Sequence, residues 1–304
     1  MAEDIPFDKI FDLKPGVVDE VMPGVRRILC NNPSPFTYKG TVSYIVGRGK
    51  VAIIDPGPED AAHTAALLDA VKGETVTNIF VTHTHRDHSP GVPPIKQATG
   101  ALVLAEGSHR PARALNVGEA PRLDASNDTD FKPDRALIDG EVVHGDGWTI
   151  EAITTPGHTA NHMAFAYKEA NVIFAGDHVM AWSTPVVAPP DGSMGDYMHS
   201  LQKLAKRSEP IYFPGHGGAV TNAPRFVAAY ILHRKAREAS IVNRLDKEGE
   251  QDIPSLVSAI YANIDPRLFK AAGLSVLAHL EDLVARGVVK TDGITSVEGR
   301  FRLA

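Results

Sequence analysis

Three histidines and an aspartate stand within six positions of the chain, in the segment "VTHTHRDH" that ends at His88. The segment follows an apolar, strand-like run, and side chains can converge on one point where a strand ends and the chain turns. Imidazole and carboxylate groups suit zinc, iron or manganese. His83, His85, Asp87 and His88 are therefore candidate metal ligands, and they are enough to serve two adjacent coordination spheres.

Three later segments repeat this arrangement: "TPGHTANH", "AGDHVM" and "FPGHGG". Each follows a strand-like run and has glycine beside its candidate ligand, which lets the backbone turn sharply close to a metal. The candidates are His158, Asp177 and His216. A single histidine is more simply a packed or solvated residue, but HxHxDH followed by three such ligands predicts a metal centre. His162 and His178 stand beside these ligands and could either orient them or be structural.

The composition is that of an ordinary globular protein, with 304 residues, 43% hydrophobic and 22% charged. A single cysteine, Cys30, excludes an intramolecular disulfide and a cysteine-based zinc site. No run approaches the roughly 18 apolar residues of a membrane helix, and the acidic start "MAEDIPFDKIFDLKPG" differs from a signal peptide. We expect a cytoplasmic protein with no membrane partner.

Hydrophobic patterning predicts a mixed α/β domain over residues 1–225. Strands are expected at 41–46, 50–55, 78–82, 101–105, 148–154, 162–167, 171–176 and 211–215, and helices at 58–72, 92–99 and 195–207. The polar segment 118–141 is predicted to be a surface loop beside the site, and 180–198 a loop that faces the substrate. Trp182, Tyr197 and Tyr44 are expected to line a pocket.

The character of the chain changes after Pro224. Helical spacing at 225–249, 253–264 and 269–287, followed by β-prone runs with turn signals in 288–304, predicts a winged-helix-like C-terminal module over 226–304. This module carries 11 Lys and Arg against 10 Asp and Glu, so it lacks the basic surface of a duplex-DNA reader. We interpret it as a lid or a dimerisation element, which leaves a homo-oligomer open.

The motifs "HTHRDH", "PGHT", "GD" and "GHG", in this order, resemble the metallo-β-lactamase superfamily over roughly residues 20 to 225. The resemblance implies a four-layer αββα sandwich with two divalent metal ions at one edge, zinc in the first instance and iron or manganese as alternatives. It implies that His83, His85 and His158 hold one ion, that Asp87, His88 and His216 hold the other, and that Asp177 bridges them. A hydroxide shared by the ions would be the nucleophile, and catalytic roles fall to Asp87 and Asp177.

Within the superfamily, "GHGGAVTNAPRFVAAYILHRKARE" and the winged-helix-like tail resemble the beta-lactamase-like protein 2 branch. That branch includes single-stranded RNA endoribonucleases and polyketide-pathway thioesterases, so the substrate is expected to be a small molecule or single-stranded RNA. The favoured function is a dinuclear hydrolase of a small ester or thioester. The alternatives are an endoribonuclease with the same metal centre and a mononuclear iron persulfide dioxygenase.

Overall fold

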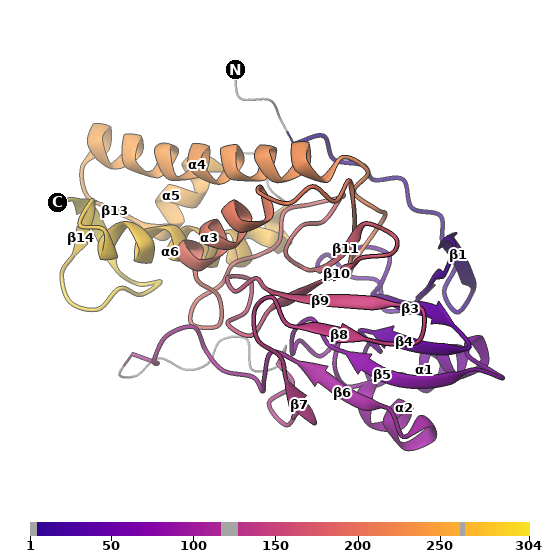
Figure 1. The fold of residues 1–304 in the computed structure, drawn as a ribbon. Helices are drawn as coiled ribbons and strands as arrows, with labels where there is room; N and C mark the ends of the chain where they lie inside the picture. The colour runs from indigo at the N-terminus through magenta and orange to yellow at the C-terminus, as the bar shows by residue number, and fades with distance from the viewer. Residues whose placement is uncertain (1–4, 117–126, 262–264) are drawn as a thin grey trace.

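The computed structural model describes residues 5–116, 127–261 and 265–304. Two β-sheets pack face to face, and helices cover their outer faces (Figure 1). This architecture confirms the predicted four-layer αββα sandwich with a C-terminal winged-helix module. None of the described helices has the length and hydropathy to cross a membrane.

The first sheet has the strand order β1-β2-β3-β4-β5-β6-β7, and the second has the order β12-β11-β10-β9-β8. The strands of the first sheet are β1 (Val18–Met22), β2 (Val25–Leu29), β3 (Val42–Arg48), β4 (Lys50–Ile54), β5 (Thr75–Phe80), β6 (Leu102–Ala105) and β7 (Arg135–Ala136). Those of the second are β8 (Val142–His144), β9 (Thr149–Thr154), β10 (Met163–Tyr167), β11 (Val172–Gly176) and β12 (Ile211–Pro214).

Aromatic side chains fill the space between the sheets. Phe80 of the first sheet meets Phe165 of the second with ring centroids 5.1 Å apart, and Trp148 contacts Phe80 edge-on. Strands β10 and β11 are buried along their whole length, because the other sheet covers one face and helices cover the other. Their continuous apolar runs, which predicted strands without alternation, follow from this double burial.

Four helices form the outer layers: α1 (Ala61–Ala70) and α2 (Val92–Thr99) against the first sheet, and α3 (Met194–Leu204) and α4 (Ala223–Glu248) against the second (Figure 1). Side-chain caps fix where two of them begin. The carboxylate of Asp60 accepts from the backbone N–H of His63 at the start of α1, and the hydroxyl of Ser193 accepts from that of Asp196 at the start of α3. Helix α2 begins with prolines and ends at Gly100, whose φ is 72°.

Parallel pairing places several strand ends at one edge of the sandwich. Strands β4 and β5 run parallel, as do β11 and β12, so the loops that follow each pair leave in the same direction. Two backbone hydrogen bonds join the sheets at this edge: Met163 N–H donates to Thr82 O at 2.7 Å, and Val42 N–H donates to Gly215 O at 2.8 Å. The loops that carry the candidate ligands therefore begin at strand ends whose relative positions are fixed by these bonds.

The C-terminal module has its own small sheet, with strand order β13-β15-β14. Its elements are β13 (Gln251–Asp252), α5 (Ile253–Ile260), the 3₁₀ helix η2 (Pro266–Leu268), α6 (Phe269–Ala285), β14 (Val289–Thr291) and β15 (Arg300–Leu303). The expected helix 253–264 ends at residue 260, and positions 262–264 lie outside the described residues. Helix α6 packs towards the sandwich, where its Ala278 joins the core under α3 and α4.

Helix α4 belongs to two cores at once. Phe226 and Tyr230 in its first half pack against the second sheet, whereas Ile241 and Leu245 in its second half pack with α5 and α6. The boundary expected between residues 225 and 226 falls in the first turn of this helix. The division into 1–225 and 226–304 stays a prediction.

Residues 118–126 of the expected surface loop lie outside the described residues, and most of its remainder is exposed, apart from the buried Asn127, Phe131 and Leu137. Two of the aromatic residues expected to line a pocket do not do so. Tyr44 and Tyr197 pack inside the two cores of the sandwich, so neither lines an open pocket. The β1–β2 hairpin was not predicted, because no residue of β1 is fully buried and its polar residues mask the apolar alternation.

The core of the C-terminal module can be tested at Leu245, which is 2% exposed. We expect Leu245→Ala to lower the free energy of unfolding by about 2–5 kcal/mol, because it removes buried methyl groups and leaves a cavity. Leu232→Ala is the control on the same helix, since Leu232 is 49% exposed and its loss should cost less than about 1 kcal/mol. Urea unfolding measures both, and equal costs would contradict the packing of α4 in the module.

Candidate metal centre

All seven predicted ligands come together at the edge where the strand ends meet. The loop after β5 carries His83, His85, Asp87 and His88, the β9–β10 loop carries His158, and Asp177 and His216 lie just after β11 and β12. Their donor atoms form three overlapping groups, in each of which the atoms lie within 4.8 Å of one another. These groups are His83–His85–His158, His83–His88–Asp177 and Asp87–His88–His216.

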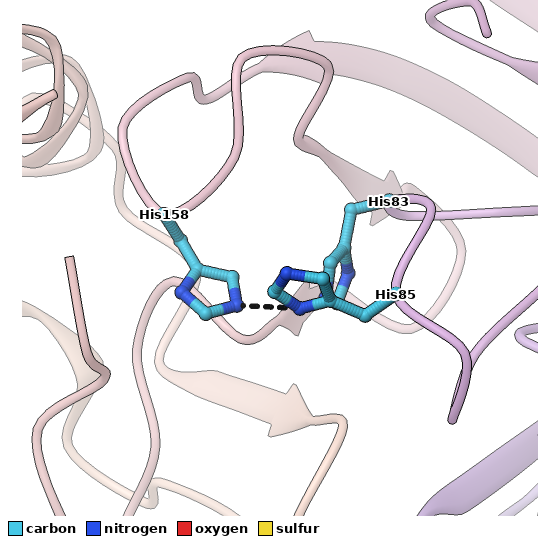
Figure 2. Close-up of side chains that lie close together, drawn as sticks. All are labelled: His83, His85 and His158. Atoms are coloured by element: carbon cyan, nitrogen blue, oxygen red, sulfur yellow. Dashed lines mark hydrogen bonds between the residues drawn. The ribbon is translucent and has the colours of Figure 1, made fainter. Parts of the chain in front are cut away.

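The first group consists of imidazoles from two loops that face each other across a short gap (Figure 2). His85 Nδ1 lies 3.0 Å from His83 Nε2 and 3.1 Å from His158 Nε2. Three ring nitrogens this close together suit a cation with metal–nitrogen bonds of about 2.0–2.1 Å. The expected partition, with these three residues at one ion, is compatible with this geometry.

The second group combines carboxylate and imidazole. His216 Nε2 lies 3.1 Å from Asp87 Oδ2, and His88 Nε2 lies 3.5 Å from the same oxygen. Asp177 stands between the two groups: its Oδ2 is 3.7 Å from His158 Nε2 and 3.3 Å from His216 Nε2. A carboxylate in this position can reach an ion in either group.

Hydrogen bonds at the far side of the rings set which nitrogen faces the centre. The Nδ1 atom of His158 donates to Val186 O at 2.7 Å, and that of His216 donates to Gly40 O at 3.1 Å. His88 Nδ1 lies 2.9 Å from Asp55 Oδ2 and donates to that carboxylate. In each neutral ring the proton is on Nδ1, so Nε2 presents a lone pair to the centre, as a metal ligand requires.

Asp55 is a site residue that the sequence reasoning missed. Its Oδ1 accepts from Thr82 N–H at 2.7 Å, and its Oδ2 accepts from the Thr82 hydroxyl at 2.7 Å as well as from His88. Because the Thr82 hydroxyl donates to Asp55, it accepts from His83 Nδ1, 3.0 Å away. Asp55 thus orients two ligands. The available sequence signal was an acid directly after the apolar run of β4 and before Pro-Gly. In the structure Asp55 adopts the left-handed conformation, with a φ of 51°.

The two histidines of undecided role differ in the structure. His162 Nε2 accepts from the backbone N–H of Asp177 at 3.1 Å, and its Nδ1 lies 2.8 Å from Thr155 Oγ1. It therefore holds the backbone that carries the bridging candidate. His178 packs its ring between Tyr197 and His162, with centroids 4.5 Å and 5.6 Å away, and is not among the grouped donors.

Burial and charge set the protonation of the two groups differently. Burial and, after it, the nearby His158 ring lower the pKa of His85 to about 3. Burial also disfavours the charged form of His216, but the carboxylates of Asp177 and Asp87 outweigh burial and raise the pKa of His216 to about 9. The first group is thus neutral imidazole, ready to ligate, whereas the carboxylates of the second attract positive charge.

Unpaired atoms at the centre test whether divalent metal ions fit. His88 Nε2 and Asp177 Oδ1 are buried and lack a hydrogen-bond partner among the described residues; they lie 3.6 Å from each other. Such orphaned buried atoms are rare in native proteins. A donor set of imidazole nitrogens and carboxylate oxygens, with lone pairs aimed inward, fits zinc, iron or manganese.

The fold and this site define the class of the protein. Residues 37–216 match the family model described as the metallo-beta-lactamase superfamily, and residues 253–297 match the beta-lactamase associated winged helix domain. The chain therefore belongs to the metallo-β-lactamase superfamily, with an appended winged helix, and is a hydrolase of that superfamily.

More particular similarities come from individual relatives. The chain is 30% identical over 279 residues to the beta-lactamase-like protein 2 homolog of Caenorhabditis elegans, covering 90% of this chain and 88% of the relative. It is also 30% identical over 233 residues to the atrochrysone carboxyl ACP thioesterase of Emericella nidulans, covering 76% and 67%. These matches agree with the expected branch of the superfamily.

Two solved structures share the fold over nearly the whole chain. A beta-lactamase domain protein from Burkholderia ambifaria superposes with a TM-score of 0.79 at 20% identity, covering 99% of this chain and 97% of the other. A metallo-beta-lactamase family protein from Thermus thermophilus superposes with a TM-score of 0.75 at 23% identity, covering 94% and 100%.

Gly215 offers a steric test of the centre. A Cβ added there would lie 2.5 Å from His88 Cε1 and 2.6 Å from Asp177 Oδ1, so we expect Gly215→Ala to displace both side chains and to lose most of one metal equivalent. Gly218→Ala is the matched control, because its Cβ would come no closer than 3.4 Å to Ile10 O. Metal quantification on both purified variants decides the matter, and full metal content in Gly215→Ala would contradict this geometry.

The role of Asp55 can be tested by Asp55→Asn. An amide places an N–H group opposite either the Thr82 N–H or His88 Nδ1, so one ligand loses its orientation. We expect metal affinity, measured by competition with a chelator, to fall by about 10 to 100-fold. The exposed Asp146 provides the control variant Asp146→Asn, which should leave affinity unchanged. Equal affinities in the two variants would remove Asp55 from the site.

Proposed function

We propose that the chain is a dinuclear metal-dependent hydrolase of a small ester or thioester. The observation that carries the proposal is the pair of facing donor groups with the Asp177 carboxylate between them. In this assignment His83, His85 and His158 hold one ion and Asp87, His88 and His216 hold the other. The ions are zinc in the first instance, with iron or manganese as alternatives.

Ions held by these residues would supply a water whose pKa is lowered to about 7 and would polarise the bond under attack. The chain's own residues have distinct roles in this reaction. Asp177 contributes a carboxylate to both groups and, with Asp87, offsets the positive charge. Asp87 Oδ2 also accepts from the Thr41 hydroxyl at 3.5 Å, which helps to fix the carboxylate at the centre. His162 and Asp55 keep the ligands in place.

A thioester is favoured over RNA for two reasons. One relative, 30% identical to this chain over 233 residues, bears the name of an acyl carrier protein thioesterase. Helix α6 occupies the position of the recognition helix of the winged helix, yet all of its residues from 275 to 280 are buried. Over these six residues the helix is covered on every side, so this stretch cannot enter a nucleic-acid groove. The electrostatics agree, because residues 1–225 carry 20 Lys and Arg against 27 Asp and Glu.

The test begins with protein purified without added metal. We expect close to two divalent ions per chain, and hydrolysis of a model thioester that a chelator abolishes and zinc restores. Asp177→Ala should lower this rate by more than about 100-fold, beyond the loss typical of residues that only orient ligands. The exposed His144 provides the control variant His144→Ala, which should retain the parent rate.

Each alternative has its own outcome in the same experiment. Chelator-sensitive cleavage of single-stranded RNA, without turnover of thioesters or other esters, would replace the substrate class and keep the metal centre. A single iron per chain with oxygen consumption on a persulfide would overturn the hydrolase. Asp177→Ala with an activity within about twofold of the parent would overturn the ligand assignment, because loss of an orienting residue alone costs at least about 10-fold.

A further inference from the structure

The loop 177–186 connects two parts of the proposed centre without a helix or strand of its own. It begins at the bridging candidate Asp177 and ends at Val186, whose carbonyl accepts from His158 Nδ1 at 2.7 Å. Residues 177–181 are buried. The carbonyl groups of a buried irregular segment need hydrogen-bond donors from elsewhere in the protein.

Side chains of α3 and α4 supply these donors. The Tyr197 hydroxyl donates to His178 O at 2.8 Å. The Tyr230 hydroxyl lies 2.7 Å from both Met180 O and Ser183 O, shares its proton between them, and accepts from Met180 N–H at 3.2 Å. Arg234 Nη2 donates to Pro185 O at 2.6 Å.

Tyr230 and Arg234 are four residues apart, so they lie on one face of α4 and reach successive points of the loop. Tyr230 is fully buried, and burial raises the pKa of its phenol well above the usual value, so the hydroxyl keeps its proton and stays a donor. The bonds from this face end one residue before Val186.

Arg234 shows that this face does more than fill space. The residue is 3% exposed, and no carboxylate lies within ion-pair distance of it in the described part of the chain. Its guanidinium sits 5.0 Å from the centroid of the Tyr197 ring, and its Nε has no hydrogen-bond partner within the described ranges. A buried cation without a counter-charge is costly, and an apolar side chain would pack at lower cost. The bond to the Pro185 carbonyl is what the guanidinium adds.

We propose that Tyr230 and Arg234 are positioning residues for the metal centre, which hold the loop 177–186 so that Asp177 and the His158 ring face the ions. The proposal rests on the ligand assignment given above. It extends the site to α4, a helix that carries none of the candidate ligands. The other half of α4 belongs to the core of the C-terminal module, so this helix connects that module to the loop that begins at Asp177.

The test uses Tyr230→Phe in the full chain, which keeps the ring and removes the hydroxyl. Tyr212→Phe is the matched control: Tyr212 belongs to the same core, and its hydroxyl makes no hydrogen bond to the loop within the described residues. Both proteins are titrated with Co²⁺ alone, and affinity and the visible absorption spectrum of the bound ion are recorded. We expect Tyr230→Phe to weaken Co²⁺ binding by about 10 to 100-fold and to alter the spectrum, with Tyr212→Phe unchanged.

Arg234 provides a second variant in case Tyr230→Phe fails to fold. Arg234→Met keeps the stem and loses the donor, whereas Arg234→Lys keeps a charged donor and should recover part of the affinity. Parent-like Co²⁺ affinity and spectrum in folded Tyr230→Phe and Arg234→Met would overturn the positioning role, whatever their melting temperatures. If Asp177→Ala also binds Co²⁺ like the parent, the ligand assignment itself fails; if only Asp177→Ala loses the ion, positioning alone is wrong.

Discussion

The structure depends on one constraint: seven metal-capable side chains must be held together in a buried place with their lone pairs and charges pointing at one another. Without a cation between them, the inward lone pairs of the neutral imidazoles repel one another and the buried carboxylates lose hydration, both of which oppose folding. The protein meets this constraint with hydrogen bonds on the side of each imidazole ring that faces away from the centre. His83, His88, His158 and His216 each use Nδ1 to contact a fixed oxygen, so each ring is anchored by its outer side and presents Nε2 inward.

These anchors link the centre to both sheets and to the helices that cover the second sheet. The oxygens that accept from the rings belong to the ends of β4 and β5, to the loop before β3 and to the loop after β11. The last of these loops is held in turn by α3 and α4. Metal geometry is therefore a property of the packing between the sheets and their outer helices as much as of the ligands themselves.

Short, periodic signals made most of the fold predictable. Buried runs of β10 and β11, the helical spacing of α2 and the glycines beside His158 and His216 each act locally, so the sequence displays them directly. The residues that support the ligands leave no such trace. Asp55 lies 33 positions from His88, and Tyr230 lies 50 from Met180, and only the packed fold makes them neighbours. In the sequence, a tyrosine or arginine on the apolar face of a helix is equally consistent with a core residue and with a residue that supports a ligand. The exposed β1 strand was missed because pairing, rather than its own pattern, makes it a strand.

The two backbone hydrogen bonds that join the sheets, from Met163 to Thr82 and from Val42 to Gly215, bear on how fast ions leave as well as how tightly they bind. Each bond ends one residue away from a candidate ligand, His83 or His216. If either bond opened, the loops that carry the ligands could move apart, and an ion held by donors from both sheets would lose some of them. Release of an ion would therefore be coupled to local opening between the sheets, whose free energy depends on how well that part of the sandwich is packed.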